Sequence, residues 1–166
     1  MSHQAPYKHF ASRDHILAAV ATRSFDHFAA ALEAARTAAP PDPAARLEAL
    51  GVAYFAYARQ HPLQYRLMFG TPLPEGQAHP GMMASARHAF DLLRQAIAGL
   101  AVQPAGPPSV PLDALFVWAA IHGLSTILQS QVLDTLGLTS DEQAAATRRM
   151  LDRIGLALGV DAPDQA

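Results

Sequence analysis

The sequence predicts an all-α fold, and three observations lead to that prediction. Alanine, a strong helix former, is abundant, whereas extended runs of β-branched residues are scarce. Apolar residues recur at the three- and four-residue spacing of one helix face. The alternation and hairpin turns that mark strands do not occur. The 166 residues, 51% hydrophobic and 16% charged, fit one globular domain with a substantial core.

Caps and helix breakers delimit the expected helices. Ser12 suits the N-cap of the first helix, and Asp42 followed by a proline suits the start of the second. Pro62 forces a boundary, Gly137 ends the long central helix, and Ser140 begins a capping box for the last one. The expected helices cover residues 13–36, 44–61, 63–69, 81–100, 112–137 and 140–159. Residues 70–80 and 103–108 are expected to be loops.

The central helix, 112–137, is apolar on nearly its whole circumference. A surface helix of a soluble domain normally buries one stripe and exposes the other. The second apolar face therefore needs a partner, and a dimer seam is the most economical one for a chain of this length. We expect a helical bundle whose last two long helices, 111–136 and 140–159, form a four-helix seam with a second copy. The expected interface residues are Leu115, Ala119, His122, Gly123, Thr126, Leu151, Ile154 and Leu158.

Composition and motifs argue against several classes of protein. The formal net charge of −2 gives no overall attraction to nucleic acid. Without cysteine, neither a disulfide framework nor a thiolate zinc site can form. The sequence has no glycine-rich phosphate loop, no His-Glu-x-x-His and no nucleophile elbow, so we expect neither an enzyme nor a cofactor. Asp113 and His122 interrupt the only long apolar run, and no signal peptide is evident, so a cytoplasmic protein without a membrane span is expected.

The eight histidines are dispersed, and none pairs at the i, i+4 spacing of a helical metal site, so no metal is expected. His122 stands out because it lies midway along the apolar central helix. A buried imidazole there requires a hydrogen-bond partner. The residues leave two interpretations open, a satisfied core or interface histidine and a histidine in direct contact with a ligand.

Residues 1–13 contain Lys8, Arg13 and two histidines but no acidic residue. The stretch 5–17, Ala-Pro-Tyr-Lys-His-Phe-Ala-Ser-Arg-Asp-His-Ile-Leu, resembles the end of the helix-turn-helix in TetR-family transcriptional regulators. In that family the recognition helix ends in Tyr-x-His-Phe, and a Ser-Lys or Ser-Arg step starts the next helix. Residues 65–69, Tyr-Arg-Leu-Met-Phe, are similar to the middle of one C-terminal subfamily of these regulators. Trp118-x-x-x-His122-Gly123 resembles the subfamily known for a Trp, His and Gly signature.

By this resemblance, residues 1–11 are the remnant of a DNA-binding domain, and residues 12–166 form a ligand-binding and dimerisation domain. The resemblance implies DNA contacts from Ser2, Gln4, Tyr7, Lys8, His9 and Arg13. The sequence begins inside the third helix of the family's DNA-binding domain. A misassigned start, a trimmed chain and a natural truncation all remain open.

Aromatic and thioether side chains gather in the middle of the chain. At helical spacing such residues can simply form a core, but the resemblance implies an apolar effector cavity between these helices. The candidate ligand-binding residues are Tyr54, Tyr57, Tyr65, Met68, Phe69, Met83, Phe90 and Trp118. No cluster of charged residues stands out within this set, so a small, mostly uncharged effector is expected.

The resemblance implies a homodimeric transcriptional regulator, a repressor, in which an effector changes the separation of two heads bound to operator DNA. An alternative from another class is a stand-alone ligand-binding or dimerisation module without DNA affinity. Such a module would sequester a full-length relative in mixed dimers. DNA binding that weakens with added salt would distinguish the regulator from the module.

Overall fold

The computed structural model describes residues 11–100, 109–130 and 132–160, and every regular element within these ranges is an α-helix. The all-α prediction is therefore confirmed for the described residues. The helices are α1 (Arg13–Ala38), α2 (Pro43–Gln60), α3 (Pro62–Phe69), α4 (Pro80–Ala98), α5 (Val110–Leu128), α6 (Val132–Leu136) and α7 (Ser140–Ala157).

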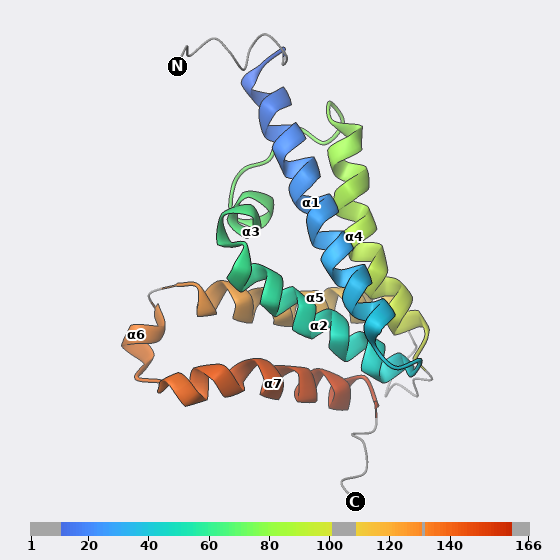
Figure 1. The fold of residues 1–166 in the computed structure, drawn as a ribbon, viewed down its shortest axis with the longest axis vertical. Helices are drawn as coiled ribbons and strands as arrows, with labels where there is room; N and C mark the ends of the chain where they lie inside the picture. Colours follow the sequence, from blue (N-terminus) through green and yellow to red (C-terminus); the bar gives the residue numbers. More distant parts are fainter. Residues whose placement is uncertain (1–10, 101–108, 131, 161–166) are drawn as a thin grey trace, which may run out of the picture.

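The helices form two crossing groups (Figure 1). Helices α1 and α4 lie side by side along the long axis of the molecule, and they share the most extensive contact between any two helices. Helices α2, α5 and α7 run across the lower end of this pair. Helix α2 contacts α1, α3, α4, α5 and α7, so most of the other helices pack against it.

Local capping explains where three of the helices begin. The Ser12 hydroxyl accepts the backbone N–H of His15 at 3.3 Å, and the Asp42 carboxylate accepts that of Ala45 at 2.7 Å, as predicted. The capping box of α7 is centred one residue earlier than expected. Thr139, rather than Ser140, accepts the N–H of Glu142 at 3.2 Å, while the Glu142 carboxylate accepts the N–H of Thr139 at 2.8 Å.

The prediction of one continuous helix over 112–137 is wrong. Helix α5 ends at Leu128, and a separate short helix, α6, follows. The N–H groups of Gln129 and Ser130 donate to carbonyls three residues back, which tightens the last turn. The Ser130 hydroxyl also donates to the Ile127 carbonyl at 2.7 Å, so a side chain competes with the helical pattern. Gly137 ends α6 as expected, with a φ of 65° that favours glycine.

The main core joins α1, α2, α3, α4, α5 and α7. Leu92 of α4 and Val117 of α5 are among its most deeply buried side chains. Helix α7 packs against α2, and at Gly51 an added Cβ would collide with the end of the Leu151 side chain. A side chain at position 51 would therefore require Leu151 to move.

Replacing Leu92 with alanine should destabilise the fold, because Leu92 is only 1% exposed and its loss leaves a cavity in the core. We expect the free energy of unfolding to fall by about 2–5 kcal/mol, measured by urea denaturation. The matched control is Leu63→Ala in α3, whose side chain is 69% exposed and should change stability by less than about 0.5 kcal/mol. Equal losses in the two variants would contradict this description of the core.

Candidate functional site

A cavity of about 330 Å³ lies between α1, α2, α4 and α5 and is closed by the last residue of α3. We call it the aromatic cavity. In the part of the chain that the structure describes, its walls contain no charged side chain, and only Tyr54 and Trp118 contribute polar side-chain groups. The lining residues are Phe25, Phe28, Leu32, Leu47, Leu50, Gly51, Tyr54, Phe69, Ala86, Ala89, Phe90, Leu93, Val117, Trp118 and Ile121.

Edge-to-face contacts between aromatic rings build the walls. The rings of Phe28 and Tyr54 are 5.1 Å apart with planes at 86°, which links α1 to α2. Phe25 and Phe69 meet in the same way at 5.9 Å, as do Phe90 and Trp118 at 5.9 Å. Such pairs are favourable beyond the area they bury and resist sliding. The walls therefore have a defined shape.

Behind the wall formed by Tyr54, three polar side chains from three helices meet. The Tyr65 hydroxyl lies 2.7 Å from the Nδ1 atom of His122, and the Tyr54 hydroxyl lies 3.0 Å from the same atom. The two hydroxyls are 3.3 Å apart. We call these residues the Tyr-Tyr-His cluster. It connects α2, α3 and α5 at the edge of the aromatic cavity, and it provides the hydrogen-bond partners that His122 requires.

The protonation states in this cluster follow from burial. Burial lowers the pKa of His122 from 6.5, so the imidazole is neutral at pH 7. Nδ1 can then accept a hydroxyl proton, with the ring proton on Nε2. Burial also raises the pKa of Tyr54, an effect that nearby Tyr65 strengthens, and burial raises the pKa of Tyr65. Both hydroxyls therefore remain protonated, and the cluster carries no charge.

Four of the candidate ligand-binding residues, Tyr54, Phe69, Phe90 and Trp118, line the aromatic cavity. Tyr65 belongs instead to the Tyr-Tyr-His cluster. The lining residues of α1, Phe25, Phe28 and Leu32, are absent from the candidate set, although they recur at helical spacing. That spacing marks a buried face and does not distinguish a cavity wall from a solid core.

The other three candidates lie away from the cavity. Tyr57 is buried and donates its hydroxyl to the Ser24 carbonyl at 3.2 Å, and Met68 is part of the core. Met83 is 36% exposed and approaches the loop at Gly76.

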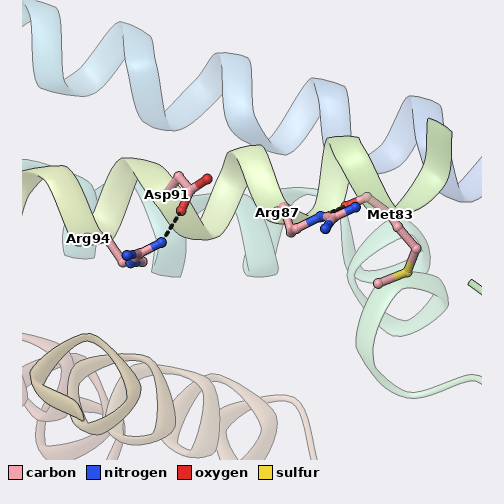
Figure 2. A network of polar contacts seen from close by, with 4 residues as sticks. All are labelled: Met83, Arg87, Asp91 and Arg94. Atoms are coloured by element: carbon pink, nitrogen blue, oxygen red, sulfur yellow. Dashed lines mark hydrogen bonds and ion pairs between the residues drawn. The ribbon is translucent and has the colours of Figure 1, made fainter. Parts of the chain in front are cut away.

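Figure 2 shows Met83 on the same helix as Arg87, whose Nε atom donates to the Met83 carbonyl at 3.3 Å. The Asp91–Arg94 ion pair, 2.9 Å long, follows along α4. Both of its side chains are largely exposed, so this pair contributes little to stability.

The candidate interface residues divide into two groups. On α5, Leu115, Ala119 and Thr126 are exposed, and a Cβ added to Gly123 would meet no atom within 4 Å. These positions lie on the outer face of the helix. Four other candidates have contacts within the subunit. The ring of His122 joins the Tyr-Tyr-His cluster, and Leu151 packs against the core. Ile154 of α7 and Leu158, the residue directly after α7, are buried in the core.

The outer face of α5 remains apolar. Its large exposed side chains are Leu112, Leu115, Phe116 and Ile127, which we call the outer α5 stripe. By length and composition alone, the helix could cross a membrane, with a mean hydropathy of 1.4. The core helix of a soluble protein meets the same criterion, and α5 packs against α2, α4 and α7. Only 22% of the helix is buried, however.

Of the candidate DNA-binding residues, Arg13 is exposed in the first turn of α1. Ser2, Gln4, Tyr7, Lys8 and His9 lie outside the described residues.

Within the described ranges, no three His, Asp or Glu side chains converge in a group that could hold a metal ion.

Lowering the pH should destabilise the fold through His122. Because its folded pKa is below 6.5, the unfolded chain takes up a proton at a higher pH than the folded chain does. The stabilising contribution is present above pH 6.5 and is lost as the pH falls through 6.5 toward the folded pKa. We expect His122→Asn, whose amide oxygen can replace Nδ1 as an acceptor, to lose less stability than the wild type between about pH 7.5 and 5.5.

Urea denaturation at the two pH values measures this difference. The other histidines are the same in both proteins, so their contribution cancels. Equal pH-dependent losses in wild type and variant would show that burial does not disfavour the charged form of His122.

Comparisons with known proteins agree with this architecture. Residues 47–154 match the family described as tetracyclin repressor-like, C-terminal domain. A solved structure described as that of a protein with unknown function from Rhodococcus sp. RHA1 is 30% identical, with a TM-score of 0.71. The match covers 90% of this chain and 78% of that one. No curated protein matches the sequence.

Proposed function

This chain belongs to the family of tetracyclin repressor-like C-terminal domains, and we propose that it is the effector-binding and dimerisation region of a cytoplasmic transcriptional repressor. The observation that carries the proposal is the aromatic cavity. Protein interiors normally contain few voids larger than a water molecule. A cavity of about 330 Å³ with aromatic walls and few polar groups has the size and character of a small-molecule site.

Helix α1 extends from the cavity to the end of the chain that we propose contacts DNA, so its movement would link effector binding to DNA binding. Phe25, Phe28 and Leu32 line the cavity from α1, and Arg13 begins the same helix. The helix has 26 residues, which is about 39 Å at about 1.5 Å per residue. An effector that displaces the middle of α1 would therefore move its distant N-terminal end. The side chains proposed to contact operator DNA are Ser2, Gln4, Tyr7, Lys8, His9 and Arg13.

Helix α5 would link effector binding to the proposed partner subunit in a similar way. Val117, Trp118 and Ile121 line the cavity, whereas the outer α5 stripe lies on the exposed side of the helix. A second copy of the chain would cover this stripe in a symmetric dimer. An effector with different affinities for two positions of α5 would then shift the arrangement of the dimer.

Filling the cavity should prevent ligand binding. Ala89 lines the cavity from α4, and Ala89→Phe would occupy part of its volume. We expect the wild type to bind the neutral probe N-phenyl-1-naphthylamine with a saturable rise in probe fluorescence, and the variant to bind it at least about tenfold more weakly, because the phenyl ring takes the probe's place. The control is Ala84→Phe on the exposed side of the same helix, which should bind as the wild type does. Equal binding by all three proteins would refute the proposed site.

A large side chain at Gly123 should disrupt the proposed dimer without disturbing the subunit. The space around Gly123 is open within the subunit, so Gly123→Leu can fold. In a packed helix seam the same side chain would cost about 1–3 kcal/mol or more. We expect sedimentation to show a weakened dimer for Gly123→Leu and an unchanged one for Gly81→Leu, a matched substitution at an open position of α4. An unchanged Gly123→Leu dimer would place the seam elsewhere.

A further inference from the structure

We propose that the aromatic cavity selects an uncharged aromatic compound that presents one hydrogen-bond donor, of the phenolic type, to the hydroxyl oxygen of Tyr54. This inference rests on the proposed function, because it specifies the ligand for the same cavity. Three features of the cavity carry it: the lack of charge, the position of its polar groups, and the balance of donors and acceptors in the Tyr-Tyr-His cluster.

The lack of charge excludes ionic ligands. Among the described residues, no Lys, Arg, Asp, Glu or His side chain lines the cavity. The nearest titratable groups, those of Tyr54, Tyr65 and His122, are neutral at pH 7 for the reasons given above. A carboxylate or ammonium group would lose its hydration inside the cavity without gaining an opposite charge, which is strongly unfavourable.

The polar groups of the lining place the ligand's single polar atom. Among the fifteen lining residues, only Tyr54 has a hydroxyl and only Trp118 has a ring N–H. Tyr54 reaches the lining from α2 and Trp118 from α5. The remaining walls are hydrocarbon. A ligand that fills the cavity can therefore satisfy one polar group beside Tyr54, and its remaining surface must be apolar.

The donor and acceptor balance determines the kind of polar group. Tyr54 and Tyr65 together offer two protons, and each hydroxyl oxygen has two lone pairs. Nδ1 of His122 accepts one proton, and the second hydroxyl donates to the first, at 3.3 Å, or to the His122 carbonyl, which lies 3.5 Å from the Tyr65 oxygen. Lone pairs on the hydroxyl oxygens are left without a proton. An incoming donor pairs with one of them without loss, whereas an incoming acceptor at Tyr54 receives a hydroxyl proton only if an existing hydrogen bond of the cluster is broken.

Ser125 adds a second sign that this polar region is incompletely paired. Its side chain is 2% exposed, and its hydroxyl has no hydrogen-bond partner among the described residues. It lies on α5, three positions after His122, whose ring the Tyr65 hydroxyl contacts at 2.7 Å. A buried unpaired hydroxyl is unfavourable. A ligand hydroxyl bound at Tyr54 would extend the cluster, and Tyr65 could then reorient toward Ser125.

Three matched compounds test the inference: 4-butylphenol, 4-butylanisole and 4-butylbenzoate. The first has a donor and is neutral at pH 7, the second keeps the ring and the oxygen but lacks the donor, and the third is an anion. Trp118 is the only tryptophan in the chain and lies in the cavity wall, so its fluorescence, excited at about 295 nm, reports binding directly. We expect the phenol to bind about fivefold more tightly than the anisole. The benzoate should not saturate at concentrations at which the phenol does.

Two variants separate the role of Tyr54 from a general loss of structure. Tyr54→Phe should bind the phenol and the anisole equally, since only the hydroxyl that receives the donor is removed. Tyr57→Phe removes a buried tyrosine hydroxyl that bonds to Ser24 and does not line the cavity, so it should keep the wild-type preference. Circular dichroism shows that each variant is folded, and a variant that is not folded is replaced by Tyr54→Leu or Tyr57→Leu.

The outcomes distinguish this inference from the proposed function. Equal affinities for phenol and anisole in the wild type, a preference that survives in Tyr54→Phe, or tight binding of the benzoate would overturn the inference while leaving the cavity as a ligand site. A complete lack of response from Trp118 to the phenol and the anisole, together with no binding of N-phenyl-1-naphthylamine, would overturn the proposed function as well.

Discussion

Helix α5 is apolar on opposite sides, and the described elements cover only one of them. The inner side carries Ala114, Val117 and Ile121, which complete the core and the cavity wall. The outer side carries the outer α5 stripe, which no described element covers. The fold follows from this constraint. Helix α2 packs on the inner side, α7 folds back beside it, and the α1–α4 pair closes the other side of the cavity.

The Tyr-Tyr-His cluster gives this arrangement its polar centre. It joins α2, α3 and α5 through hydrogen bonds among neutral groups, so it adds specificity to helix packing without a buried charge. The ring of His122 also lies 5.1 Å from that of Phe69 and 5.8 Å from that of Trp118, both in the cavity wall. A displacement of Phe69 or Trp118 would therefore change the ring contacts of His122. Thr126, on the exposed face of α5, donates its hydroxyl to the His122 carbonyl at 2.9 Å.

Much of the helical architecture could be predicted because its signals are local. Ser12, Asp42 and Pro62 mark helix boundaries through their own backbone and side-chain chemistry. The break after Leu128 could not be predicted, because the apolar periodicity continues across a short polar segment. The hydrogen bonds of that segment end the helix. The need of His122 for a partner could be predicted. Its partners could not, since Tyr54 and Tyr65 are 68 and 57 positions away in the sequence and meet it only through packing.

Gly51 has a consequence for how the two sides of α2 communicate. It lines the aromatic cavity on one side, and on the other it receives the end of the Leu151 side chain from α7. At this point the partition between the cavity and α7 is only one polypeptide backbone thick. A molecule seated against Gly51 would be separated from the end of the Leu151 side chain only by the backbone of α2. The smallest residue in the wall thus connects the cavity with a side chain of the C-terminal helix.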